Sequence, residues 1–221
     1  MKGLPFDVYD FFGYIAAGIV VLVTAQLGWG FPILLGRTLS VFDTTAATLA
    51  AYIAGQIVAG PSGSLLEDLF ARRLLGTPVK ILLGQNSCHP LRFLFPAYFT
   101  PLPPKVIGRI EKMIAPLKLT SESEEIFTRI RFSGPVLANE ALLAKLNTFL
   151  YKYGFCRNVA FSLLCASAAF FLRNRFAGNQ HLDLARYALA ALVAGFLLIY
   201  RYLFFYRLYS YELMNQFAGH E

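Results

Sequence analysis

The segment LARYALAALVAGFLLIYRYLFF, residues 184–205, is apolar over a length sufficient for one membrane crossing. A helix needs roughly 20 mostly apolar residues to cross the hydrocarbon core of a bilayer. Residues 11–27, 45–59 and 155–172 have the same character. Hydrophobic residues make up 57% of the chain and charged residues only 15%, which differs from the usual composition of soluble domains. The sequence therefore predicts an all-α integral membrane protein with four transmembrane helices.

The four apolar segments form two pairs separated by a polar stretch. We expect residues 1–62 to form the first transmembrane hairpin, residues 63–152 a cytosolic helical insert, and residues 153–221 the second transmembrane hairpin and C-terminal tail. Helical periodicity within the insert predicts helices near four positions: 65–74, Lys105, Glu122 and Asn139. The last of these has no breaker before the third span and is expected to run into it. Gly60-Pro61-Ser62-Gly63 is expected to break or kink the second span.

The distribution of basic residues indicates the orientation. Lys and Arg accumulate in loops that remain in the cytoplasm. The insert carries most of the 20 basic residues of the chain: Arg72, Arg73, Lys80, Arg92, Lys105, Arg109, Lys112, Lys118, Arg129, Arg131, Lys145 and Lys152. This favours a multi-pass protein of the bacterial inner (plasma) membrane with the insert and both termini cytoplasmic. Arg173, Arg175 and Arg186, in and beside the second hairpin loop, count against that orientation.

Three ionisable residues fall near the predicted cytoplasmic boundary of the spans: Asp10, Arg157 and Arg201. Charged groups in lipid are costly and usually find partners. Asp10 could neutralise Arg157 or Arg201 and connect three spans through an ion pair. The alternative is that both arginines extend to lipid headgroups.

The second span carries small residues at four-residue spacing: Ala47, Ala51, Gly55 and Ala59. This spacing places all four on one helix face, where two backbones can approach closely. The face fits packing between helices of one chain, or a subunit contact in a homo-oligomer.

The C-terminal segment Tyr200–Glu212 is rich in aromatic and basic residues. Tyr202, Arg207 and Tyr209 are candidates for docking to lipid headgroups, as in an interfacial aromatic belt, or to a cytosolic partner protein. The net charge of +7 fits the positive-inside bias and attraction to anionic lipid, so we do not expect nucleic acid as a partner.

Catalytic signatures are sparse. Cys88 and His89 are the densest pair of nucleophile and base types, but side chains adjacent in sequence usually point apart. No phosphate-binding loop or metal-ligand spacing is present, so we expect no metal or cofactor and no enzymatic activity. The segment Phe93–Phe99 is too short to span and is expected either to lie in the membrane interface or to pack onto the insert.

Three short motifs carry a family resemblance: DFFGY at 10–14, YGFCRN at 153–158 and YRYLFFYRLY at 200–209. They resemble segments of small bacterial four-span inner-membrane proteins. Proteins of this build occur among membrane components of bacterial anti-phage systems, so the resemblance implies a setting in antiviral defence.

Together these features predict a non-enzymatic membrane sensor, scaffold or effector that oligomerises and couples its cytosolic insert to the membrane. A channel or transporter subunit is the alternative, although few polar residues fall at midspan. A membrane enzyme using Cys88 and His89 is the third reading.

Overall fold

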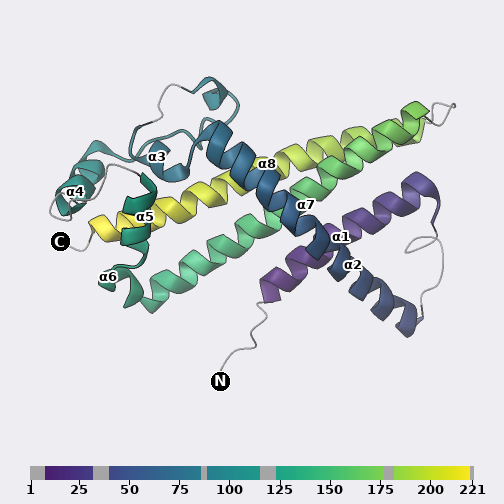
Figure 1. Ribbon diagram of the computed structural model, residues 1–221, viewed down its shortest axis with the longest axis horizontal. Helices are drawn as coiled ribbons and strands as arrows, with labels where there is room; N and C mark the ends of the chain where they lie inside the picture. The colour runs from purple at the N-terminus through teal and green to yellow at the C-terminus, as the bar shows by residue number, and fades with distance from the viewer. Residues whose placement is uncertain (1–7, 32–39, 86–88, 115–122, 177–181, 220–221) are drawn as a thin grey trace. The chain divides into compact units, whose positions relative to one another are not determined.

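The computed structural model describes residues 8–31, 40–85, 89–114, 123–176 and 182–219, and within these ranges every regular element is a helix. The side chains of residues 8–10 lie outside the description. The elements, in chain order (Figure 1), are α1 (Val8–Trp29), α2 (Val41–Ser62), η1 (Gly63–Leu75), α3 (Pro78–Leu82), η2 (Pro90–Arg92), α4 (Pro104–Ile114), α5 (Ser123–Arg131), α6 (Gly134–Leu137), α7 (Glu140–Phe176) and α8 (Leu182–Ala218).

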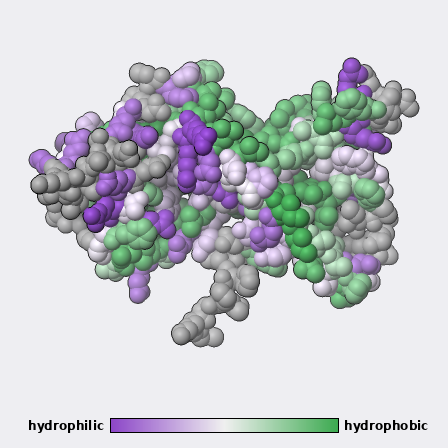
Figure 2. Space-filling model, viewed as in Figure 1, coloured by the Kyte–Doolittle hydropathy of each residue, from purple (hydrophilic) through white to green (hydrophobic). Residues whose placement is uncertain are grey.

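Four helical stretches are long and apolar enough to cross a membrane: Phe11–Trp29, Val41–Leu82, Glu140–Phe176 and Asp183–Ala218. This confirms the all-helical class and the four membrane-length helices expected from the sequence. Large apolar side chains lie on the surface of two of them at four-residue spacing: Leu49, Ile53 and Ile57 on α2, and Leu189, Val193 and Leu197 on α8. Figure 2 shows broad hydrophobic surface over the region that Figure 1 assigns to these helices. Such a surface is typical of helices that face an apolar environment.

The chain divides into two compact units, Met1–Asp68 with Gly154–Tyr202, and Leu69–Tyr153 with Leu203–Glu221. The end of α8, which belongs to the segment expected to form the second hairpin and C-terminal tail, packs with the insert. Helix length explains this, because α7 and α8 each contain 37 residues. At 1.5 Å per residue each is about 55 Å long, against roughly 30 Å for the hydrocarbon core. Both helices therefore belong partly to each unit.

In the first unit, α1 and α2 cross with their backbones in contact (Figure 1). A Cβ atom added at Gly18 would lie 1.7 Å from the Ala51 carbonyl oxygen, and one added at Gly55 would lie 1.9 Å from the Tyr14 carbonyl oxygen. Both positions therefore require glycine. The rings of Tyr14 and Tyr52 meet edge to face, with centroids 6.0 Å apart.

The first-unit portions of α7 and α8 pack antiparallel. Ser167 Oγ donates a hydrogen bond of 2.8 Å to the Ala188 carbonyl oxygen. Gly195 allows α8 to lie against Ala160 and Leu164, because an added Cβ there would lie 3.2–3.4 Å from their atoms. Small residues at these positions let the helix axes approach closely.

The second span does not end at Pro61. It continues as a π-helix, η1, through Leu75, so the Gly60–Gly63 segment, expected to break or kink the span, does not end the helix, and the helical winding changes after it. Proline lacks an N–H and its ring crowds the carbonyl of the preceding turn, and a wider turn accommodates this without ending the helix. Gly76, with φ of +89°, follows Leu75 and ends the helix, close to the end of the helix expected over residues 65–74.

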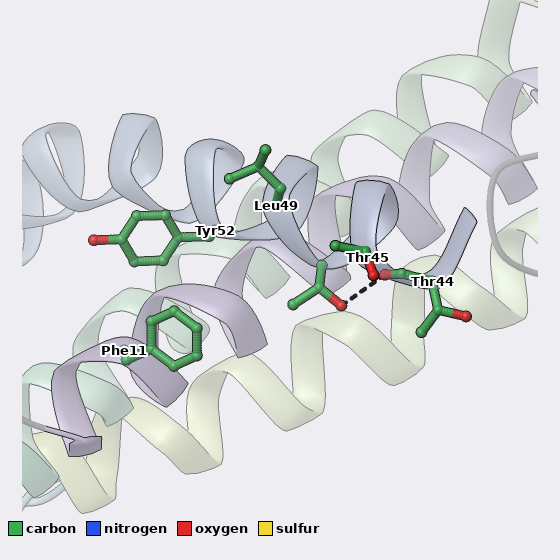
Figure 3. A pocket seen from close by; sticks show the side chains of 6 residues that line it. Phe11, Thr44, Thr45, Leu49 and Tyr52 are labelled. Carbon is green, nitrogen blue, oxygen red and sulfur yellow. Dashed lines mark hydrogen bonds between the residues drawn. The ribbon is translucent and has the colours of Figure 1, made fainter. Parts of the chain in front are cut away.

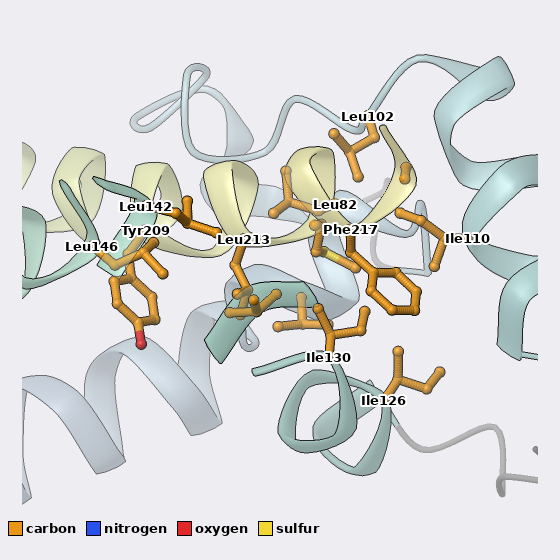
Figure 4. Close-up of a cluster of buried hydrophobic side chains, with 14 residues drawn as sticks. Leu82, Leu102, Ile110, Ile126, Ile130, Leu142, Leu146, Tyr209, Leu213 and Phe217 are labelled. Carbon is orange, nitrogen blue, oxygen red and sulfur yellow. The ribbon is translucent and has the colours of Figure 1, made fainter. Parts of the chain in front are cut away.

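The second unit is a helical module with its own apolar core (Figure 4). Short helices α3 to α6 surround side chains supplied by the N-terminal part of α7 and the C-terminal part of α8. Its buried members include Leu82, Ile110, Ile126, Ile130, Leu142, Leu146, Leu213 and Phe217. The connection before α4 is tied to the core by the Leu102 N–H, which donates to the Leu82 carbonyl at 2.9 Å.

Tyr98 fixes the long connection between α3 and α4. Its hydroxyl donates a 2.9 Å hydrogen bond to the Gly76 carbonyl, at the turn that ends η1. Burial, with a smaller effect of Tyr206, raises the pKa of Tyr98 well above its usual value, so the phenol remains a hydrogen-bond donor at neutral pH.

Candidate functional site

A buried polar cluster in the first unit joins the start of η1 to α7. Arg157 pairs with Glu67 through its Nη1 atom, and the two side chains are only 17% and 13% exposed. Ser62 Oγ donates to Asn158 Oδ1 at 2.6 Å, and both residues are buried. Arg157 Nε and Nη2 also lie 3.4 Å from the same Asn158 oxygen. The cluster forms a hydrogen-bonded clamp that contains an ion pair.

Local sequence explains the position of each group. Pro61 and the π-helical winding after it carry Ser62 and Glu67 on one continuous helix. Arg157 and Asn158 are consecutive residues of the uninterrupted helix α7. A charge pair and an amide among apolar helices are stable only when their polar atoms bond one another, which this cluster achieves.

The predicted boundary residues are placed as follows. Arg157 pairs with Glu67 of η1. Arg201 is exposed on α8. The side chain of Asp10 lies outside the described residues, so an ion pair with either arginine remains a prediction.

The small-residue ladder of α2 lies at the crossing with α1. Ala51 and Gly55 are buried there, and Ala47 and Ala59 are half-buried. The centre of the ladder is therefore occupied by α1 of the same chain. Gly18, its partner on α1, was missed from the sequence because α1 shows no ladder of its own.

The C-terminal strip contributes mainly to packing. Tyr202 and Tyr209 are 0% and 5% exposed, so they present almost no surface to a partner. The Tyr209 hydroxyl accepts a hydrogen bond from Arg131, whose guanidinium also lies 5.6 Å from the Tyr209 ring centre. Arg207, half-buried, donates to the Thr100 carbonyl at 2.7 Å. These contacts tie α8 to α5 and to the connection before α4.

The imidazole ring of His89 makes a hydrogen bond and a stacking contact within the connection between α3 and α4. Its Nδ1 atom accepts a hydrogen bond from the Leu91 N–H at 3.2 Å, and its ring stacks on Phe99 with centroids 5.2 Å apart. Cys88 lies outside the described residues. Among the residues that are described, no group of three or more His, Cys, Asp or Glu side chains could hold a metal ion.

An open groove of about 630 Å³ lies between α1 and α2 (Figure 3), lined by Phe11, Thr44, Thr45, Thr48, Leu49 and Tyr52. The three threonine hydroxyls donate to carbonyls one turn earlier in their own helix, at 2.8–3.0 Å. Their hydroxyl donors are thus used within the helix, and most of the groove's surface is apolar.

No protein-family model, curated protein or solved structure matches this chain. Its function therefore has to follow from its own residues.

Proposed function

We propose that this chain is a non-enzymatic scaffold or sensor of the bacterial inner membrane that couples a cytosolic helical module to its membrane spans. The continuity of α7 and α8 carries the proposal. Each helix supplies apolar membrane-length sequence to the first unit and buried side chains to the core of the second. A continuous helix that belongs to two units can carry a rotation or displacement from one to the other.

The Arg157–Glu67 clamp supports the same role. It joins η1, the segment that leads into the module, to α7, one of the two shared helices. A movement of α7 would therefore displace η1, through which the chain enters the module. In this proposal the insert and both termini are cytoplasmic, and bacterial anti-phage defence is the setting implied by the sequence resemblance.

The proposal also includes oligomerisation, through a helix face other than the small-residue ladder of α2. Ala51 and Gly55 are covered by α1, so a subunit contact needs another surface. The stripe of Leu189, Val193 and Leu197 is 52–62% exposed and suits a second copy of the chain in the membrane.

Native mass spectrometry of the protein purified from its own host in mild detergent tests this function. We expect a defined homo-oligomer, either alone or with a cytosolic protein bound. The composition of this complex is expected to differ between membranes taken before and after phage infection. A lone monomer with no bound protein under both conditions would contradict the proposal. Ion or solute flux in liposomes at low protein density would instead support a channel.

A further inference from the structure

Two large apolar side chains project from the connection between α3 and α4. Phe93 is 95% exposed and its neighbour Leu94 is 44% exposed, while the adjacent Arg92 is also exposed. Single apolar residues are common on protein surfaces, but a phenylalanine with almost its entire side chain in solvent, next to an exposed leucine, forms an apolar tip.

The tip is held by a short hydrogen-bonded turn. The Arg92 N–H donates to the His89 carbonyl and the Leu94 N–H donates to the Leu91 carbonyl, both at 3.0 Å. The imidazole of His89 accepts from the Leu91 N–H and stacks almost parallel on Phe99, at 9°. The backbone at Phe93 is therefore fixed with its side chain outward.

Three aromatic residues that follow the tip in the chain are buried. Phe95, Tyr98 and Phe99 are at most 2% exposed. The Phe95 ring meets Phe70 of η1 edge to face, with centroids 6.2 Å apart. The segment Phe93–Phe99, for which the sequence left two environments open, thus separates into a buried base and an exposed apolar tip.

A bilayer surface is the occupant that fits this tip. The module is joined to the first unit at three points of the chain, after Asp68, before Gly154 and before Leu203. It is therefore always tethered to the membrane that holds the spans. An aromatic and an aliphatic side chain beside an arginine match the interfacial zone, where rings lie at headgroup depth and arginine binds phosphate. Exposed Arg72, Arg73 and Lys80 of the same unit add attraction to anionic lipid.

We propose that the Arg92-Phe93-Leu94 tip is a membrane-interface anchor of the helical module. Phe93 and Leu94 insert into the headgroup–acyl boundary, and Arg92 binds the phosphate of an anionic lipid. The anchor rests on the proposed membrane residence of the chain, and it adds a contact between module and bilayer that is separate from the spans.

Tryptophan fluorescence of the full chain in phosphatidylcholine–phosphatidylglycerol vesicles tests the anchor. Trp29 is the one tryptophan in the sequence, so F93W in a W29F background reports on the tip alone. The matched control is F132W in the same background, because Phe132 is 64% exposed and also follows an arginine. We expect blue-shifted emission at position 93 and strong quenching by lipid brominated near the headgroup, with neither effect at position 132. Adding R92Q, or omitting phosphatidylglycerol, reduces the quenching at position 93.

Emission at position 93 that is quenched by aqueous iodide and unaffected by brominated lipid would overturn the anchor. Equal lipid quenching at positions 93 and 132 would also overturn it, since the tip would then be no different from the rest of the module. The wild-type protein distinguishes a failure of the anchor from a failure of membrane insertion. Trp29, at the end of α1, is quenched by brominated acyl chains only when the chain is inserted in the bilayer.

Discussion

Replacing Gly55 with alanine is expected to lower the free energy of unfolding by about 3 kcal/mol, towards the upper end for overpacking of a close contact. The added Cβ would lie 1.9 Å from the Tyr14 carbonyl oxygen, a backbone atom that cannot rotate away. α1 and α2 would have to separate, and the contact between the Tyr14 and Tyr52 rings would be lost with them. Gly18→Ala is expected to act in the same way, since its Cβ would meet the Ala51 carbonyl oxygen.

Gly154→Ala is the matched control. Gly154 lies inside α7, and no atom lies within 4 Å of a Cβ added there. Alanine favours a helix over glycine by about 0.8–1 kcal/mol, so this variant is expected to be slightly more stable than the wild type. The measurement is the denaturation midpoint in mild detergent, titrated with SDS. Equal midpoints for G55A and G154A would show that α1 and α2 do not cross at Gly55.

Replacing Glu67 with glutamine is expected to cost about 3 kcal/mol, because it removes a charge of a largely buried pair and leaves Arg157 without that carboxylate. The residual exposure of the two side chains places the effect at the lower end of the range for buried pairs. Asp183→Asn is the control, since Asp183 and Arg186 form a pair that is 76% and 68% exposed. Breaking such a surface pair costs at most about 1 kcal/mol.

A double variant separates the charge pair from general disruption. Glu67→Leu with Arg157→Met replaces both charges by apolar groups, and such replacements of a buried pair are often neutral or stabilising. We expect it to recover most of the stability that E67Q loses, measured by the same SDS titration. If the double variant is as unstable as the sum of the two single variants, Glu67 and Arg157 do not act as a pair.

Hydropathy and helical periodicity were sufficient to predict the helical class and the four membrane-length helices. Whether a helix can span a membrane depends on its composition over about 20 residues, and this composition can be read from a single sequence. The spacing of Ala51 and Gly55 likewise predicted a close-packed face. It could not identify the helix that covers that face, because the partner glycine, Gly18, has no small residue four positions before or after it.

The polar clamp was less predictable. Arg157 was recognised as a charge that needs a partner, but Glu67 has the position of a solvent-facing residue in an amphipathic pattern. Its burial depends on the helix continuing past Pro61, where the sequence favoured a break or kink. Whether a proline ends a helix or changes its winding is decided by tertiary contacts such as the one between Ser62 and Asn158.

Tyr202 and Tyr209 show the same limit. Their aromatic and basic surroundings are typical of an interfacial belt, yet both side chains are buried. Phe93 is the most exposed of the described aromatic residues in the second unit, at 95%, and its outward position depends on the turn at His89.

Cysteine labelling in intact cells tests most directly whether the membrane holds the helical module in the cytoplasm. The three native cysteines are replaced by serine, and single cysteines are introduced as Ser40→Cys, Lys105→Cys and Gly219→Cys, all at exposed positions. A membrane-impermeant maleimide is expected to label the cysteine at position 40, before α2, in intact cells. It should label those at positions 105 and 219 only after lysis. Labelling of position 105 in intact cells at the rate of position 40 would place both on the same side of the membrane and contradict a cytosolic module.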